Sequence, residues 1–485
     1  MKISNLNYKK ILVCLWIISL VTFLTENAIG GPPQKREYWP TNDWRTSIPE
    51  AQGMDSAKLM IADEFIQNRL PDAFSLLIVR NGYLVFEKYY RWGSPEKYAV
   101  VHSVTKSVTS ALIGIALGKG YLNGVDQKLV EFFPEYITGD LDPRKKELTL
   151  KHLLSMSAGF RWNDWGPDML NWHRSSDWAK HTIQLPQIHD PGEVFTYNTS
   201  ISHLLSIVLT KSTQTGTLDF AKQDLFEPLG MSSTYWHQGP QGYHIGGFGL
   251  GLSARDLAKF GFLYLNNGFW DGRSIVPEQW VKESTRPWMS AGHSLYGPMA
   301  YGYHWWITDV DGCFSYRAIG RRGQFIVVVP ELDLVMVVTS NTAPLPYPTA
   351  IHYSPLFDLV AGSVKRARPP RKPPQAVALP AEVKAFVADF NQAIQDLDQE
   401  KIADLFSGRF LHNGGGKQMT LAVLMGAMSY WSKCRLVLTR FEPEGEVARV
   451  EGVIQDPYFE IPLLPGAMLI KEQGRWKWYG NQIQK

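Results

Sequence analysis

The chain has few cysteines for its length: Cys14, Cys313 and Cys434 are the only three among 485 residues. Three cysteines cannot form a disulfide framework, and these have no metal-ligand spacing. An excess of one charge is also lacking, because 49 Lys and Arg are balanced by 46 Asp and Glu. This balance gives no reason to expect a nucleic-acid partner. The fold must therefore depend on a hydrophobic core, which a chain of this length can bury.

Long apolar runs are also lacking, except near the N-terminus. The uncharged run 11–24 follows Lys9 and Lys10, and Ala28-Ile29-Gly30 offers the small-x-small pattern of a cleavage site. A membrane-spanning helix needs about 20 apolar residues, so this run is short for a span. We therefore expect residues 1–30 to be a signal peptide. The mature protein would then be periplasmic or secreted, without an integral membrane span; an uncleaved N-terminal anchor is the alternative.

Several well-known catalytic motifs are absent as well. The sequence has no Gly-x-Ser-x-Gly, His-Glu-x-x-His, Cys-x-x-Cys or Walker motif. We therefore predict neither a metal nor a cofactor.

Residues 363–380 form the clearest boundary, with five prolines, five basic residues and no acid. Such a composition cannot build a core and is typical of a stiff, extended linker. The predicted organisation is a signal peptide at 1–30, a large body at 31–362, the linker at 363–380 and a small unit at 381–485.

Within the large body, strands are expected near both ends and helices between them. Asn81-Gly82 between apolar runs predicts a β-hairpin, and β-branched runs around residues 330–333 predict a second. This pattern favours an antiparallel sheet with an inserted helical region. The small unit has helices first and strands later, which predicts an α+β fold. The expected elements are strands 75–79, 84–89, 324–329 and 334–339 and helices 201–209, 257–265 and 278–283 in the body, then helices 382–397 and 399–406 and strands 435–441, 447–454, 468–471 and 475–479.

The most informative chemical pattern is Ser103-Val104-Thr105-Lys106, which leads into an apolar helical run at 107–117. Residues i and i+3 share one face of a helix, so the Lys106 amine can reach the Ser103 hydroxyl. A serine needs a base to become a nucleophile, and burial lowers the pKa of a lysine enough for it to act as one. The alternative is a helix-capping serine followed by a solvated lysine. A second such tetrad, Ser94 to Lys97, lies in a turn-like stretch and is set aside.

Three ordered segments resemble the motifs of the serine β-lactamase and penicillin-recognising superfamily. They are HSVTKSVTSALIGIAL, Tyr197-Asn198-Thr199 and Gly320-Arg321-Arg322-Gly323-Gln324. The similarity runs from about residue 74 to 341 and is greatest to the class C-like esterase and amidase branch, which includes the 6-aminohexanoate-dimer hydrolases. It implies an α/β (α+β) class fold, with a β-lactamase/transpeptidase-like antiparallel sheet flanked by helices, plus a helical region.

The resemblance also implies roles for individual residues. Ser103 would be acylated, Lys106 would be its base, and Tyr197 would relay the proton to the leaving group. The backbone N–H groups of Ser103 and Gln324, the latter beside Gly323, would form the oxyanion hole.

Two residues depart from the family pattern. Thr199 stands where many relatives have Asn, and Arg321 stands where relatives carry Lys or His. Arginine stays charged and cannot pass a proton, but it can bind a substrate carboxylate through two hydrogen bonds. The departures make efficient β-lactam hydrolysis a weaker expectation than acyl transfer in general.

The sequence is rich in tryptophan, with 17 copies. Trp162, Trp165 and two further copies lie between the first two motifs, and Trp305 and Trp306 precede the third. Loops around a cleft are where aromatic side chains line a ligand site, so we expect Trp162 and Trp165 to bind substrate. The alternative for about half of these rings is simple core packing.

The small unit resembles the SnoaL-like cone fold, a group whose members enclose a small ligand or mediate dimerisation. We see no catalytic constellation there, and the oligomeric state stays open. The sequence as a whole predicts an exported serine hydrolase that cleaves a small amide or ester through an acyl-enzyme. Two alternatives remain: a penicillin-binding DD-peptidase or β-lactamase, and a non-catalytic ligand-binding module.

Overall fold

The structure is a computed structural model that describes residues 36–137, 141–231, 235–294, 297–341, 350–366, 378–412, 415–418, 420–421, 434–455, 460–463, 466–480 and 482. The predicted signal peptide at 1–30 and residues 367–377 of the predicted linker lie outside this part of the chain.

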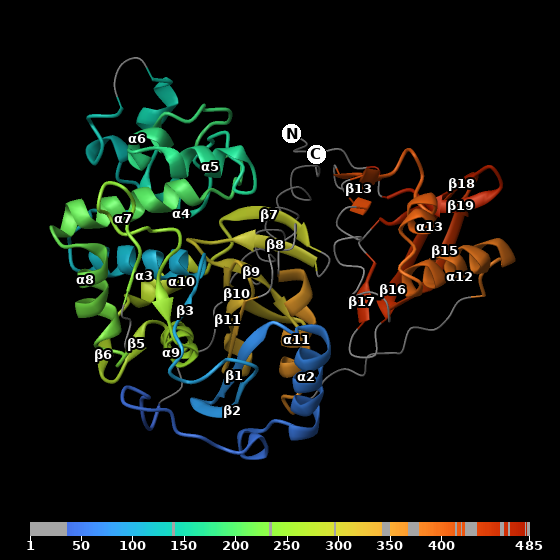
Figure 1. The fold of residues 1–485 in the computed structure, drawn as a ribbon, viewed down its shortest axis with the longest axis horizontal. Coiled ribbons are helices and arrows are strands. Elements are labelled where there is room, and N and C mark those ends of the chain that lie inside the picture. The colour runs from blue at the N-terminus through green and yellow to red at the C-terminus, as the bar shows by residue number, and fades with distance from the viewer. Residues whose placement is uncertain are drawn as a thin grey trace, which may run out of the picture.

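The body is built on an eight-stranded antiparallel sheet in the order β2-β1-β12-β11-β10-β9-β8-β7 (Figure 1). The predicted antiparallel sheet flanked by helices is therefore confirmed. The strands of this sheet are β1 (Ala73–Arg80), β2 (Tyr83–Tyr89), β7 (Met289–Ser294), β8 (Gly297–Tyr301), β9 (Trp306–Val310), β10 (Cys313–Gly320), β11 (Gln324–Val329) and β12 (Leu334–Ser340).

Both predicted hairpins are present. Asn81 and Gly82 connect β1 to β2 with φ angles of 53° and 86°, the left-handed pair that a tight hairpin turn requires. Residues 330–333 connect β11 to β12. Strand β1 also pairs with β12, with Arg80 opposite Leu334. The first and last strands of the body are thus neighbours in the sheet.

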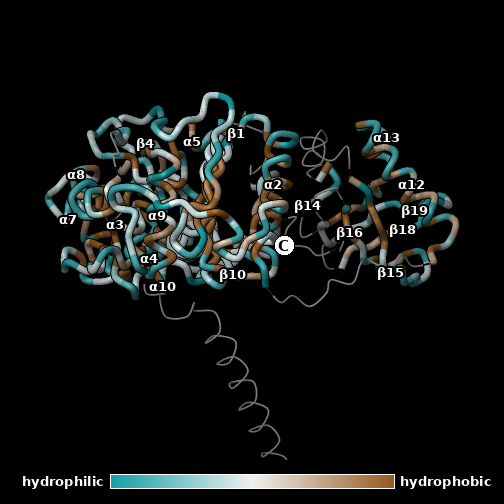
Figure 2. The backbone as a smooth tube through the Cα atoms, turned by 90° about the horizontal axis from the view of Figure 1, so that it is seen from below, coloured by the Kyte–Doolittle hydropathy of each residue, from teal (hydrophilic) through white to brown (hydrophobic). Residues whose placement is uncertain are grey.

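Alternate residues of the central strands face opposite sides of the sheet. Leu76 and Ile78 pack under α2 (Ser56–Arg69) and α11 (Ala350–Gly362). Leu77 and Val79 belong to the larger core on the other face, which includes residues of α3 (Val104–Gly118) and α9 (Ala254–Leu265). Brown, hydrophobic stretches of the tube run through this interior in Figure 2.

The helical region joins the sheet on the side of the larger core. The helices predicted at 201–209, 257–265 and 278–283 are confirmed as parts of α7, α9 and α10. Helix α7 begins at Thr199 because the Asn198 side chain accepts the backbone N–H groups of Ser200 and Ile201. The helices of this region are α4 (Leu150–Leu154), α5 (Pro167–Arg174), α6 (Trp178–Ile183), α7 (Thr199–Thr213), α8 (Thr217–Ala221) and α10 (Glu278–Ser284).

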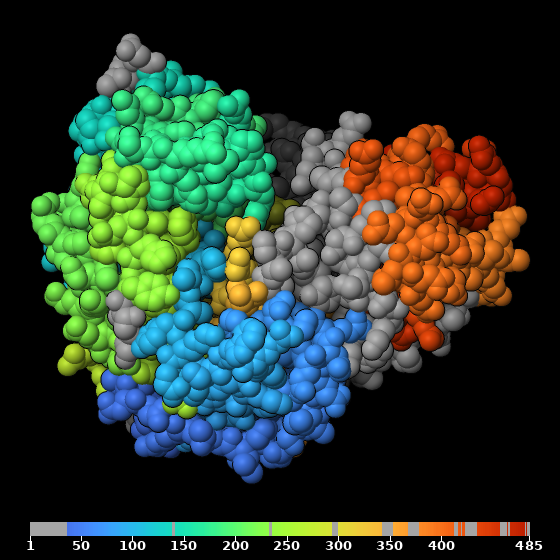
Figure 3. Space-filling view, in the orientation of Figure 1, coloured from blue at the N-terminus to red at the C-terminus, as the bar shows by residue number. Residues whose placement is uncertain are grey.

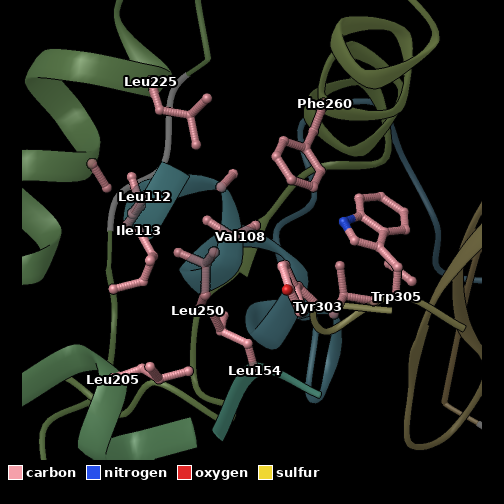
Figure 4. Packing of buried hydrophobic residues seen from close by; sticks show 14 of the residues in the cluster. Val108, Leu112, Ile113, Leu154, Leu205, Leu225, Leu250, Phe260, Tyr303 and Trp305 are labelled. Atoms are coloured by element: carbon pink, nitrogen blue, oxygen red, sulfur yellow. The ribbon is translucent and has the colours of Figure 1, made fainter. Parts of the chain in front are cut away.

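Helix α3 runs through the middle of the larger core and is buried from Val104 to Ala116. Figure 4 shows Val108, Leu112 and Ile113 of this helix with Leu205 and Leu250 among the side chains packed around it. Its polar side chains, among them Lys106, are buried together with the apolar ones, so the helix is covered on all sides. The helix therefore gives whatever lies at its N-terminus a rigid support.

The C-terminal unit has its own core, which includes Phe386, Phe390 and Trp478. The predicted helices and strands of this unit are present as α12, α13, β15, β16, β18 and β19, and three further short strands were not predicted. The chain stays attached to the body as far as Arg366, which forms an ion pair with Asp311. The domain limits and the SnoaL-like fold stay predictions. The elements are α12 (Ala381–Gln395), α13 (Gln399–Asp404), β15 (Arg435–Glu444), β16 (Val447–Gln455), β17 (Glu460–Pro462), β18 (Met468–Glu472) and β19 (Arg475–Trp478), and the remaining short strands of the chain are β3 (Ala99–Val100), β4 (Gly251–Leu252), β5 (Phe269–Trp270), β6 (Arg273–Ser274), β13 (Leu411–His412) and β14 (Gly415–Gly416).

No helix in the described ranges is both long and apolar enough to cross a membrane.

Candidate active site

Ser103 lies at the sharp turn that leads from the short strand β3 into helix α3. His102 has a φ of 47°, a left-handed conformation that is uncommon for a residue other than glycine. Ser103 is the N-cap of α3, and its side chain makes no capping hydrogen bond. Its hydroxyl is therefore left for another partner, at the helix end that favours negative charge.

That partner is Lys106, one turn along the same helix. Its ammonium nitrogen Nζ donates to Ser103 Oγ at 3.1 Å, to Thr199 Oγ1 at 3.0 Å and to the Gly247 carbonyl oxygen at 3.0 Å. The side chain is 1% exposed. Burial lowers the pKa of Lys106 to about 8, and the nearby charge of Asp164 opposes this shift. The structure thus brings serine and lysine together as the spacing predicts.

Tyr197 lies against the same lysine, with Lys106 Nζ 4.9 Å from the centre of its ring. The ring stacks on Trp306, with centroids 5.5 Å apart, and meets Tyr301 edge-on. Burial raises the pKa of Tyr197 far above its usual value, the charge of Asp164 adds to this, and a hydrogen bond with Ser103 partly offsets it. The phenol therefore stays protonated over the neutral range, a state in which it can donate a proton but cannot act as a base.

Thr199 connects this group to a carboxylate that the sequence analysis missed. Its backbone N–H donates to Asp164 Oδ1 at 2.8 Å and its hydroxyl donates to Asp164 Oδ2 at 2.6 Å. Trp162 Nε1 also donates to Asp164 Oδ1, at 2.5 Å. The available sequence signal was an acid inside the Trp-rich segment between the first two motifs, but nothing local to that segment indicates that it meets Thr199.

The turn from Arg321 to Gly323 follows a close approach between Gly320 and the segment that leads to Ser103. A Cβ on Gly320, just before it, would come within 2.3 Å of the carbonyl oxygen of Val101, two residues before Ser103. Arg321 is exposed, with its guanidinium carbon 6.0 Å from the centre of the Trp165 ring.

Gly323 and Gln324, which follow the two arginines, are held in place by contacts with buried residues. Gly323 has a φ of 91°, and a side chain there would collide with the Tyr353 hydroxyl. Gln324 begins β11 opposite Gly320, and its buried side chain donates to the Ser340 carbonyl. Only its backbone is therefore available for the predicted oxyanion role.

The tryptophans near the motifs differ in burial. Trp172 and Trp178 are buried, with ring centroids 4.0 Å apart, and Trp305 is fully buried, so these three rings belong to the core. Trp165 is 69% exposed. Trp162 is buried and reaches the site through its hydrogen bond to Asp164. Fewer of these rings are exposed than the count suggested.

Two histidines that the sequence analysis did not select also lie near Lys106. Burial and the positive charges of Arg322, Arg321 and Lys106 lower the pKa of His102 to about 4. His304 donates from Nδ1 to the Lys106 carbonyl oxygen at 3.0 Å, and burial lowers its pKa to about 3. Both rings are therefore neutral at pH 7. Among the residues that the structure describes, no three His, Cys, Asp or Glu side chains are grouped so as to hold a metal ion.

The site is assembled from segments far apart in the sequence. Ser103, Thr199 and Gly247 meet at one amine, although about 145 residues separate the first from the last. Figure 3 shows the blue N-terminal, green helical and yellow strand segments meeting on one face of the body.

Comparison with known proteins gives matches over more than half of the chain. The Beta-lactamase family model matches residues 62–354. The 6-aminohexanoate-dimer hydrolase of Paenarthrobacter ureafaciens is 22% identical over 335 residues, which cover 64% of this chain and 82% of that protein.

Solved structures share the fold at low sequence identity. The octameric penicillin-binding protein homologue from Pyrococcus abyssi has a TM-score of 0.55 and 18% identity, covering 87% of this chain and 95% of that chain. EstCE1, a hydrolase with promiscuous acyltransferase activity, has a TM-score of 0.53 and 15% identity, covering 63% of this chain and 98% of that chain.

Proposed function

Since the chain belongs to the Beta-lactamase family, whose members are serine hydrolases, we propose that it cleaves a small amide or ester through an acyl-enzyme on Ser103. One observation carries the proposal: the buried Lys106 amine lies 3.1 Å from the Ser103 hydroxyl. A buried lysine with a lowered pKa supplies the base that a serine nucleophile needs.

In the acylation step, neutral Lys106 takes the Ser103 proton while Oγ bonds to the substrate carbonyl carbon. Charge develops on the carbonyl oxygen, and the backbone N–H groups of Ser103 and Gln324 would donate to it. Tyr197 then gives its proton to the leaving nitrogen or oxygen as the scissile bond breaks, and Lys106 returns the serine proton to Tyr197. Water repeats the sequence on the acyl-enzyme, releasing the acid and restoring Ser103.

The exposed guanidinium of Arg321 extends the proposal to substrates that carry a carboxylate. In the described part of the chain Arg321 forms no ion pair, and it lies beside the exposed ring of Trp165. A guanidinium binds a carboxylate through two parallel hydrogen bonds. We expect Arg321→Gln to raise KM for a carboxylate-bearing ester about tenfold and to leave KM for a neutral ester unchanged.

Labelling with a fluorophosphonate probe, followed by intact mass measurement, tests the proposal directly. Wild type should gain one adduct and Ser103→Ala none. Ser94→Ala is the matched control, because Ser94 begins the other Ser-x-x-Lys tetrad and should leave the adduct unchanged. No adduct on wild type, or an equal adduct on Ser103→Ala, would contradict the proposal.

A penicillin-binding or β-lactamase activity is the second candidate, and the match to the Beta-lactamase family model supports it. Turnover of nitrocefin and of D-Ala-D-Ala peptides, compared with p-nitrophenyl esters, separates the two candidates. A non-catalytic binding module would instead show ligand-induced stabilisation that is equal in wild type and Ser103→Ala, without turnover.

We further propose that residues 1–30 export the protein to the periplasm or the medium, and that residues 381–485 form a SnoaL-like unit. N-terminal sequencing of the secreted protein tests the first proposal. The mass of the full chain in solution, with and without a deletion after residue 366, tests whether this unit mediates dimerisation.

A further inference from the structure

Asp164 accepts three hydrogen bonds, and two of them come from Thr199. The residue lies on the segment that precedes α5, 35 positions before Thr199. It therefore connects the Trp-rich segment to the first turn of helix α7.

The direction of these hydrogen bonds fixes the Thr199 hydroxyl. A threonine hydroxyl has one proton, and here it points to Asp164 Oδ2 at 2.6 Å. A carboxylate oxygen can only accept, so the Thr199 oxygen has only lone pairs left for Lys106 Nζ at 3.0 Å. Both Lys106 and Ser103 depend on this orientation, because a hydroxyl proton aimed at the amine would compete with the serine for its lone pair.

The charge of Asp164 stabilises the protonated form of Lys106. Among the described residues, it is the carboxylate whose charge raises the pKa of Lys106 against the effect of burial. When Ser103 gives up its proton, Lys106 becomes cationic in a dry interior, where a nearby negative charge stabilises it.

We propose that Asp164 is a positioning residue, which acts through Thr199 to hold Lys106 as the acceptor of the Ser103 proton and to balance its charge. This inference rests on the proposed function, because it assumes that Lys106 is the base. The Thr199 hydroxyl could otherwise rotate, and the Asp164 carboxylate fixes the direction of its proton.

Other titratable groups lie near Lys106, and their titration must be distinguished from the effect of Asp164 on Lys106. His102 and His304 are neutral above about pH 5, because the pKa of His102 is lowered to about 4 and that of His304 to about 3. Tyr197 keeps its proton, since burial raises its pKa. Arg321 and Arg322 act on His102 with a charge that is constant over the range of the experiment.

A simpler role for Asp164 is to cap α7, since it accepts the N–H of the first residue of that helix. The two roles differ in what the Asp164→Asn variant does. An amide would donate to the Thr199 oxygen from the place of Oδ2, which would turn the hydroxyl proton toward Lys106. It would also remove the counter-charge, so the pKa of Lys106 should fall.

The test measures Lys106 itself and its reaction with a probe. Lysine labelled with carbon-13 at Cε is titrated by NMR in Ser103→Ala, with Lys106→Arg to assign the signal. Fluorophosphonate labelling of Ser103 is followed from pH 6 to 10 in the otherwise wild-type chain. For Asp164→Asn, we expect the Lys106 pKa to fall by about one unit. The plateau rate of labelling should fall about tenfold.

Asp168→Asn is the matched control, because Asp168 accepts the Asn163 N–H in the same segment and has no hydrogen bond to Thr199. It should move neither the titration nor the rate. Thr199→Ser should keep both values. Thr199→Val removes the hydroxyl but keeps the Asp164 charge, so it should lower the labelling rate without lowering the Lys106 pKa, which keeps the test decisive if Asp164→Asn folds poorly.

The outcomes separate the inference from the proposed function. A lower melting temperature for Asp164→Asn with an unchanged Lys106 titration and an unchanged pH dependence would overturn the positioning role and leave only the cap. A shifted Lys106 titration together with no labelling of Ser103 in any variant would support the positioning of Lys106 and overturn the proposed function.

Discussion

The rate at which Ser103 is acylated should rise with pH and level off above about pH 9, because only the neutral amine of Lys106 can take the hydroxyl proton. The burial of Lys106 lowers its pKa from 10.5 to about 8. At pH 7 the neutral fraction is then about one in eleven, and at pH 9 it is about ten in eleven. The rate should therefore increase about tenfold between these values.

Burial greatly increases the fraction of Lys106 that is neutral at pH 7. A lysine that kept the ordinary pKa of 10.5 would be neutral at pH 7 in only about one molecule in three thousand. Desolvation thus supplies about 300 times more base at pH 7. Protonated Lys106 cannot act as a base, so activity should be lost as pH falls through about 8.

The assay is the second-order rate of fluorophosphonate labelling from pH 6 to 10, or kcat/KM for an activated ester corrected for alkaline hydrolysis. Lys106→Arg, whose side chain stays charged, should lose activity at every pH. A rise centred near pH 10 would refute the reasoning, because Lys106 would then titrate as a solvated amine. A rise centred near 6.5 would refute it as well, since neither His102 nor His304 titrates there.

Three further outcomes are expected. Tyr197→Phe should lower kcat about 100-fold for amides and much less for p-nitrophenyl esters, whose leaving group needs no proton; equal losses in steady-state assays would contradict the relay. Trp172→Ala should cost about 3–5 kcal/mol in the free energy of unfolding, whereas the exposed Trp165 should cost under about 1 kcal/mol, as denaturant titration would show; equal costs would undo the division into core and surface rings. Gly247→Ala should reduce kcat/KM about tenfold with little change in melting temperature, because the added Cβ would come within 2.8 Å of Thr199 Cγ2 and 3.4 Å of Lys106 Nζ. Full activity of this variant would show that the Gly247 carbonyl does not position the lysine.

The features that the sequence predicted well are local. Asn81-Gly82 specifies its own turn, and the Ser103–Lys106 pair is fixed by one helical turn. The features that it did not predict depend on contacts between distant segments. Asp164 acquires its place from Thr199, and the third partner of Lys106 is a backbone carbonyl at Gly247, which has no side chain to mark it.

The burial of the individual tryptophans could not be predicted from the sequence either. Their clustering lies in the segment that carries Asp164, but it could not tell the buried ring of Trp172 from the exposed ring of Trp165. Periodicity predicts that one face of a helix is buried, whereas which irregular segment covers a cleft depends on the whole chain.

The pairing of β1 with β12 affects how the protein folds. Arg80 pairs with Leu334, so forming this part of the sheet closes a loop of about 250 residues, and contacts of such long range form slowly. Until then, strand β1 lacks the neighbour that β12 supplies, and the cores on both faces of the sheet stay incomplete. A nascent chain that ends before β11 would already contain Ser103, Lys106, Thr199 and Gly247, but not the strands that complete the sheet. The residues of the candidate site thus come before the last strands of the sheet that supports them.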